Sequence, residues 1–213
     1  MKVSLSILTV NYLSVEESLK DYINDVDYVH LDVMDGVFVP NISCGPSVVK
    51  SLRKLDDKLI FDTHLMIEYP DKYIKQFSEA GSQYITFHVE AKSDVMKTIE
   101  LIKSYNVKAG ISIKPNTKVE EIKKYLPYVD MVLVMSVEPG FGGQKFMDIA
   151  VDKVKELYSL REKEGYNYLI NIDGGINDTT GLKIKDYVDM AVSGSYVVNN
   201  QNPKEAISKL HNL

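Results

Sequence analysis

Histidine and aspartate side chains at the ends of short apolar segments are the groups in this sequence best suited to chemistry. His30 and Asp32 end one such segment. His64 ends the next, and Asp173 ends one near the C-terminus. Burying a charged group there is costly unless it is paired or bound to a metal. Two imidazoles and two carboxylates suit a divalent cation, with Zn²⁺ as first choice and Fe²⁺, Mn²⁺ or Co²⁺ as alternatives. A hydrogen-bonded polar layer would suit the same spacing.

Asp32 and Asp173 also suit acid/base chemistry at carbon. If their segments belong to one barrel, the two carboxylates approach a bound substrate from different sides. One could remove a proton from a carbon while the other returns a proton to the opposite face, which inverts a stereocentre. A cation on a neighbouring oxygen would stabilise the enediolate between these steps. Asp62, one layer below His64, is expected to orient a histidine.

Methionines and glycines follow the same segments. Met34, Met66 and Met135 would form an apolar collar that excludes water from a carbanion, with ordinary core packing as the alternative. Glycines recur after three late segments, in 140–143, 173–175 and 193–195. Amides without side chains allow close approach of a phosphate, so these loops predict a phosphate site. Each glycine could also serve only a turn, and 140–143 could also be a mobile lid.

Eight apolar segments alternate with eight amphipathic ones, and this alternation predicts parallel strands joined by helices. The expected strands are 3–8, 28–33, 59–66, 84–89, 107–113, 129–135, 168–173 and 188–193. The expected helices are 15–24, 46–55, 70–80, 93–104, 118–125, 148–163, 177–185 and 203–211. No linker divides the chain, and the first strand lacks a following G-x-G-x-x-G turn. We therefore expect an α/β fold of the (β/α)8 TIM-barrel class, as one domain over 1–213. The polar residues fall at the strand ends, where such barrels carry their active sites.

The composition narrows the classes of partner. The 213 residues carry a net charge of −5, which argues against a nucleic-acid binder. No apolar run is long enough to span a membrane. The single cysteine, Cys44, excludes an internal disulfide and suits a cytoplasmic protein. With only Arg53 and Arg161 as arginines, a bound phosphate would depend mainly on backbone amides.

Four stretches carry a resemblance to a known family. They are residues 30–41 (HLDVMDGVFVPN), 62–66 (DTHLM), 134–146 (VMSVEPGFGGQKF) and 173–176 (DGGI). Together they resemble the signature of the ribulose-phosphate 3-epimerases, and the resemblance extends from Ser6 to Ser195. It implies a TIM barrel of the ribulose-phosphate-binding type and the interconversion of D-ribulose 5-phosphate and D-xylulose 5-phosphate in the pentose phosphate pathway. It also implies a small sugar phosphate as ligand and assembly into homo-oligomers.

The resemblance assigns roles to individual residues. It implies one divalent metal ion held by His30, Asp32, His64 and Asp173, with Asp32 and Asp173 as the catalytic acid/base pair. Ser6 and His64 would touch the sugar. The phosphate end would be held by Gly140, Phe141, Gly142, Gly143, Gly174, Gly175, Gly194 and Ser195.

Other functions fit parts of the same pattern. A 3-epimerase of a ketohexose phosphate such as allulose 6-phosphate would use the same chemistry with more room at the sugar. A decarboxylase or aldolase of the orotidine-phosphate type would place a lysine in D-x-K-x-x-D, and residues 32–35 (DVMD) have none. A metal-dependent hydrolase and a binding protein without catalysis are two further alternatives.

Overall fold

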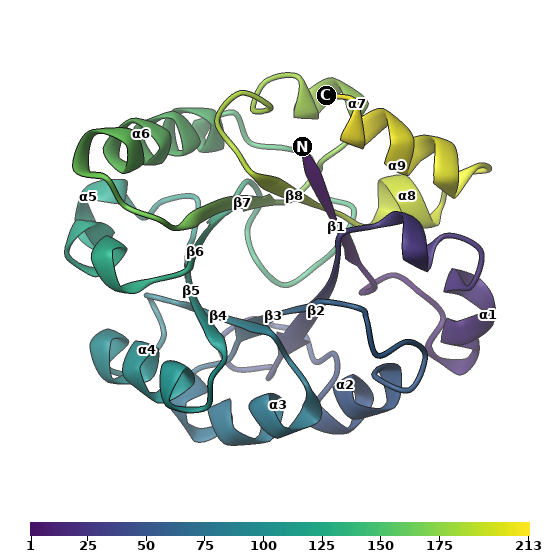
Figure 1. Ribbon diagram of the computed structural model, residues 1–213, viewed down its shortest axis with the longest axis horizontal. Coiled ribbons are helices and arrows are strands. Elements are labelled where there is room, and N and C mark those ends of the chain that lie inside the picture. The colour runs from purple at the N-terminus through teal and green to yellow at the C-terminus, as the bar shows by residue number, and fades with distance from the viewer.

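The computed structural model describes all residues, 1–213, and its centre is a closed barrel of eight parallel strands in sequential order (Figure 1). The predicted barrel is thus confirmed, and each strand lies within two residues of its predicted bounds. Sequential order places β2 and β7 three positions apart around the ring through β1 and β8. The strands are β1 (Lys2–Ser6), β2 (Tyr28–Met34), β3 (Phe61–Met66), β4 (Tyr84–His88), β5 (Lys108–Ile113), β6 (Met131–Met135), β7 (Leu169–Asp173) and β8 (Met190–Ser193).

Helices surround the ring of strands on its outer side (Figure 1). Their starts follow local capping chemistry: Asp94 accepts a hydrogen bond from the Lys97 N–H at the start of α4, and Pro46 and Pro203 occupy first-turn positions. Gly81 and Gly165 end α3 and α6 in the left-handed conformation. The helices are α1 (Val15–Leu19), α2 (Pro46–Leu52), α3 (Ile74–Ala80), α4 (Val95–Ser104), α5 (Val119–Ile122), α6 (Ile149–Glu164), α7 (Asp178–Gly181), α8 (Ser195–Val198) and α9 (Pro203–His211).

Several predicted helices are shorter than expected. The predicted helix 15–24 is α1 followed by a separate 3₁₀ turn at Ile23–Asp25, and 70–80 divides into a 3₁₀ turn at Pro70–Lys72 and α3. The predicted helix 118–125 is α5 followed by a 3₁₀ segment that contains Pro127. Proline lacks the N–H that a continuing α-helix needs, so the tighter winding takes over there. Helix α8, a single turn after β8, was not predicted.

The main hydrophobic core lies between the strands and the helices. Side chains alternate across each strand, so odd-numbered residues such as Leu31 and Leu65 pack outward against the helices. Even-numbered residues of β2 and β3 point into the barrel. The inward face is apolar at the strand starts, where Tyr28, Met131 and Met190 cluster. Above them the interior becomes polar, and this polar layer supports the candidate site.

At the end of the barrel where the strands start, side-chain acceptors bind unpaired backbone N–H groups in a repeated pattern. The strands pair as β1/β2, β3/β4, β5/β6 and β7/β8. In each pair, the side chain of the residue just before the even-numbered strand accepts a hydrogen bond from a backbone N–H at or near the start of the odd-numbered strand. This satisfies amides that the ladder leaves unpaired. Arg53 and Arg161 also lie at this end, bonded to the Leu59 and Tyr168 carbonyls, far from the strand ends that carry the polar cluster. The four pairs are Asp27–Val3, Gln83–Phe61, Asp130–Ala109 and Asp189–Ile170, at 2.7–2.9 Å.

The helices of the barrel are short or amphipathic. None of them combines the length and the apolar character that a membrane-spanning helix requires.

Candidate active site

The structure brings His30, Asp32, His64 and Asp173 together at the C-terminal ends of β2, β3 and β7. One ligand-type atom from each lies within 4.8 Å of all the others. Strand register explains part of this arrangement, because Asp32 pairs with His64 across β2 and β3. Both imidazoles are fully buried, Asp32 is buried, and Asp173 is 17% exposed. The cluster therefore has its histidines below and a carboxylate toward the opening.

His30 is held by a second carboxylate beneath the cluster. Its Nδ1 lies 2.8 Å from Asp62 Oδ2, and Asp62 also accepts from Asn171 at 3.2 Å. Because an ionised carboxylate only accepts, the proton lies on His30 Nδ1. In the neutral ring Nε2 then carries a lone pair. The orienting role expected of Asp62 agrees with this contact.

The chemistry of the cluster fits a metal ion. His30 Nε2 is buried without a hydrogen-bond partner, 3.3 Å from Asp32 Oδ1 and 4.0 Å from Asp173 Oδ2. A lone pair so close to two carboxylate oxygens is repelled by them unless a proton or a metal cation lies between. Imidazole nitrogens and carboxylates are the ligands that Zn²⁺ and related divalent ions take. These residues can therefore hold a divalent metal ion.

The environment drives the pKa values of the two cluster aspartates in opposite directions. Burial would raise the pKa of Asp32, but the charge and hydrogen bond of His30 outweigh burial and hold it far below its usual range. Burial and the nearby Asp32 charge raise the pKa of Asp173 to about 7. Burial disfavours charge on His30, yet Asp32 and Asp62 prevail and raise its pKa well above the usual value. The pair thus offers one carboxylate that stays ionised and one that holds a proton near neutrality.

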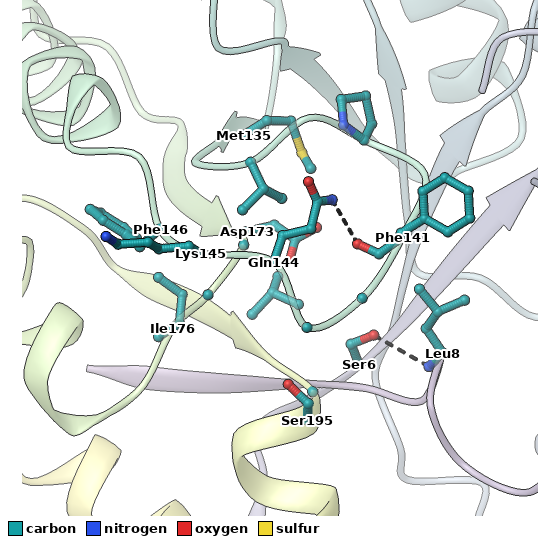
Figure 2. A pocket seen from close by; sticks show the side chains of 18 of the residues that line it. Ser6, Leu8, Met135, Phe141, Gln144, Lys145, Phe146, Asp173, Ile176 and Ser195 are labelled. Atoms are coloured by element: carbon teal, nitrogen blue, oxygen red, sulfur yellow. Dashed lines mark hydrogen bonds between the residues drawn. The ribbon is translucent and has the colours of Figure 1, made fainter. Parts of the chain in front are cut away.

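A cavity of about 600 Å³ opens above Asp32 and Asp173. Figure 2 shows Ser6, Met135 and Asp173 around the same hollow, although they come from β1, β6 and β7. Ser6 Oγ donates to Asp32 Oδ2 at 2.8 Å. The three predicted methionines, Met34, Met66 and Met135, line the cavity and are at most 4% exposed. They form an apolar wall around the two carboxylates.

Every predicted phosphate residue lines this cavity. The backbone N–H groups of Gly142, Gly143, Gly175 and Ser195 donate no hydrogen bond within the chain. Gly142 and Gly143 are exposed, so water can satisfy their N–H groups, whereas Gly175 and Ser195 are half-buried and line the cavity with free donors that suit an anion. No arginine lines the cavity. The expectation that amides face the anion is consistent with these free donors.

His64 differs from the other predicted substrate residues because it does not line the cavity. Its ring lies fully buried beneath the floor, with Nδ1 3.2 Å from Asp32 Oδ1. Contact of His64 with a sugar stays a prediction.

The loop between β6 and α6 is fastened by residues that the sequence analysis missed. Gln144 Nε2 donates to the Glu138 carbonyl at 2.7 Å and to the Phe141 carbonyl at 2.8 Å (Figure 2 shows the second bond). Asn41 Nδ2 donates to the Gly140 carbonyl at 2.8 Å from the loop after β2. Asn41 and Gln144 both lie in the stretches that carry the family resemblance, which is the only sequence signal for them. Other unpredicted residues of the cavity wall include Leu8, Thr9, Lys145, Phe146, Ile176, Tyr196 and Asn199.

A closed (β/α)8 barrel with a His/Asp cluster and a cavity at the C-terminal ends of its strands has the architecture of a TIM-barrel enzyme. The sequence model of the ribulose-phosphate 3 epimerase family matches residues 2–198. This chain belongs to that family and is an epimerase, an enzyme of the isomerase class.

Curated relatives agree with this assignment. The chain is 41% identical to a ribulose-phosphate 3-epimerase of Bacillus subtilis (strain 168) over 99% of its own length and 98% of the relative's. It is 35% identical to the protein of the same name from Helicobacter pylori (strain J99 / ATCC 700824), over 100% and 98% of the two lengths.

Solved structures resemble the chain in fold. KGPDC from Streptococcus mutans superposes with a TM-score of 0.72 at 14% identity, covering 99% of this chain and 95% of that one. A 3-hexulose-6-phosphate synthase from Salmonella typhimurium gives 0.74 at 17% identity, covering 100% and 97%. At such low identity the likeness shows the barrel alone.

Proposed function

We propose that this enzyme interconverts D-ribulose 5-phosphate and D-xylulose 5-phosphate by moving a proton at carbon 3 with Asp32 and Asp173. The observation that carries this proposal is the geometry: Asp32 and Asp173 come from strands three positions apart, meet in one cluster and line one cavity, and their pKa values shift in opposite directions. Groups whose environments push their pKa values apart commonly divide into base and acid. The names of the curated relatives support the choice of substrate.

The two aspartates divide the work by their protonation. Ionised Asp32 accepts the proton from carbon 3, and the substrate becomes an enediolate. Protonated Asp173 donates its proton to carbon 3 from the other face, which leaves the inverted centre. After one turnover Asp32 holds the proton and Asp173 is ionised, which is the starting state for the reverse direction. Asp173, at 17% exposure, is the better placed of the two to exchange its proton with water.

His30, Asp32, His64 and Asp173 would hold a divalent metal ion, with Zn²⁺ as the first choice. When bound, the ion supplies positive charge that stabilises developing negative charge on oxygens next to carbon 3. Asp62 keeps the His30 ring oriented, and Ser6 fixes the second oxygen of Asp32. The methionine wall keeps water from the carbanion-like carbon.

The phosphate of the substrate would occupy the amide-lined end of the cavity. Binding energy from this remote group positions carbon 3 between the two carboxylates. The free N–H donors of Gly142, Gly143, Gly175 and Ser195 support this placement.

Turnover in D₂O tests the proposal. Incubation with Zn²⁺-loaded enzyme should place deuterium at carbon 3 of both ketose phosphates. Asp32→Asn and Asp173→Asn should each lower kcat by a factor of about 10²–10⁴, the usual contribution of a positioned acid or base. Active enzyme that leaves carbon 3 unlabelled, or variants with near wild-type kcat, would show the proton-transfer scheme to be wrong. Parallel assays with allulose 6-phosphate decide between pentose and hexose phosphate.

A further inference from the structure

His88 ends β4 and Glu90 follows two residues later. Together they form a chain of hydrogen-bond contacts that reaches His64, a member of the His/Asp cluster. His64 Nε2 lies 2.9 Å from His88 Nε2, and His88 Nδ1 lies 3.2 Å from Glu90 Oε2. Neither residue lines the cavity, and the proposed reaction gives neither a role. The His88 ring is fully buried.

The direction of each hydrogen bond between Glu90, His88 and His64 follows from the contacts of Glu90. Glu90 Oε1 accepts from the Lys114 N–H at 2.8 Å and from the Thr117 hydroxyl. A carboxylate that receives such donors is ionised and can only accept, so the proton shared with His88 belongs to His88 Nδ1. Burial opposes ionisation of Glu90, but its hydrogen bond with His88 and the other donors prevail and lower its pKa to about 2.

The His88 ring then determines the proton on His64. A neutral imidazole with its proton on Nδ1 offers a lone pair at Nε2. The fully buried setting of His88 favours this neutral ring, because a charged imidazole would be poorly solvated there. The proton between the two rings must therefore come from His64 Nε2. His64 Nδ1 is left with its lone pair 3.2 Å from Asp32 Oδ1, a contact between two acceptors that is favourable only when a cation lies between them.

The surroundings hold this chain of contacts in one geometry. The Phe38 ring packs against His88 with 4.9 Å between ring centroids, and Lys114 Nζ lies 4.0 Å from the Phe38 centroid. Lys153, buried in α6, donates to the carbonyls of Lys114, Pro115 and Thr117 at 2.6–2.8 Å. The loop that supplies the donors to Glu90 is thus fastened from a helix on the outside of the barrel.

We propose that His88 and Glu90 are positioning residues that fix His64 in its Nε2–H tautomer, so that Nδ1 is presented to the metal ion. This inference rests on the metal site of the proposed function. It parallels the other side of the cluster, where Asp62 fixes His30 directly and leaves Nε2 for the metal. The two histidine ligands would therefore bind through different ring nitrogens.

Nitrogen NMR of the histidine rings reads this arrangement directly. The chain has only four histidines, so a ¹⁵N-histidine-labelled sample gives few signals. Long-range ¹H–¹⁵N spectra without added metal should show His64 protonated at Nε2 and His88 protonated at Nδ1. With Zn²⁺, the His64 Nδ1 signal should shift on coordination. A His64 ring protonated at Nδ1, or coordinated through Nε2, would overturn the proposal.

Paired variants at position 88 test the effect on metal affinity. In His88→Phe the His64 N–H loses its acceptor, and Zn²⁺ affinity measured by chelator competition should fall about 10- to 100-fold. In His88→Gln the amide oxygen can accept from His64 while the amide NH₂ donates to Glu90, so most of the affinity should return. Thr86→Val is the matched control. Thr86 is equally buried on the same face of β4, and its hydroxyl contacts only Met131 Sδ.

Glu90→Gln is the second variant, because Glu90 is 23% exposed and its replacement is less disruptive than that of buried His88. One amide oxygen then faces three donors, so Zn²⁺ affinity should fall by about the same factor. Co²⁺-loaded protein should show an altered visible spectrum in both His88→Phe and Glu90→Gln. Folded variants with wild-type Zn²⁺ affinity and wild-type Co²⁺ spectra would refute the positioning role. A wild-type protein that binds no Zn²⁺ would instead refute the metal site, while the metal-free NMR spectrum still decides the tautomer.

Discussion

Replacement of Gly175 by alanine should damage substrate binding through a backbone collision that can be worked out from the structure. Gly175 has φ +62°, and an added Cβ would lie 2.7 Å from the Phe146 nitrogen and 2.9 Å from the Gln144 carbonyl oxygen. Ordinary contact begins at about 3.4 Å, so the 144–146 backbone must move by about 0.7 Å. That segment directly follows Gly142 and Gly143, whose amides belong to the proposed phosphate site.

The expected loss follows from the size of this shift. Misplacement of binding groups by about 1 Å can cost about 10²-fold in rate, so kcat/KM for D-ribulose 5-phosphate should fall about 10- to 100-fold. The alanine also carries the strain of a left-handed backbone, which costs about 1–2 kcal/mol of stability. Initial rates and urea unfolding measure the two effects separately.

Gly165→Ala is the matched control. Gly165 has φ +67°, but nothing lies within 4 Å of its Cβ position at the end of α6. This variant should lose about 1–2 kcal/mol of stability with unchanged kcat/KM. If Gly175→Ala loses stability to the same extent and also keeps kcat/KM within twofold of wild type, the reasoning that places the phosphate beside the amides of Gly142, Gly143 and Gly175 is refuted.

Four further predictions concern the metal cluster and the barrel. Asp62→Asn should weaken Zn²⁺ binding about 10- to 100-fold, because the charge that orients His30 is lost; unchanged affinity in chelator competition would contradict this. Zn²⁺ affinity should also fall as the pH drops below the raised pKa of His30, because a proton then occupies the nitrogen offered to the metal. In the metal-free protein, protonation of His30 stabilises the fold, because its pKa is higher in the folded than in the unfolded state. This stabilisation is fully present below pH 6.5 and is lost as the pH rises through the raised pKa. Urea unfolding at several pH values measures it. Asp189→Ala should cost about 2–3 kcal/mol of unfolding free energy, because the Ile170 N–H and Arg161 both lose a charged partner; a loss under about 0.5 kcal/mol would contradict the stabilising role of this contact.

The barrel could be predicted from the sequence because its signal is local. Each strand is a short apolar run bounded by polar residues, and period-two alternation already places His30, Asp32 and Met34 on one face. The orienting position of Asp62 came from the same alternation, two residues before His64. The weakest predictions were the short helices, where Pro127 turned a predicted helix into a 3₁₀ segment and the single turn of α8 had too few residues to show a periodic pattern.

The chain of contacts through His88 could not be predicted because it depends on the stagger between strands. Alternation predicts that His88 faces inward, but not which residue it meets. The register pairs His64 with Thr86, so His88 lies two residues farther along β4 than the direct partner of His64. Its ring reaches His64 across that offset. Glu90 likewise meets Lys114 and Thr117 only because β4 and β5 are neighbours in the closed ring.

The charge balance of the cluster explains why the same residues respond to both protons and metals. Asp32, Asp62 and Asp173 bring three carboxylates to one buried region with two imidazoles, and such an excess of negative charge is costly inside a protein. Without a cation, the favoured response is to take up protons, which is what the raised pKa values of His30 and Asp173 describe. Two protons carry the charge of one divalent ion. A divalent ion held by this cluster would therefore supply positive charge that protons supply in its absence, and that charge would stabilise the ionised form of whichever aspartate has given up its proton.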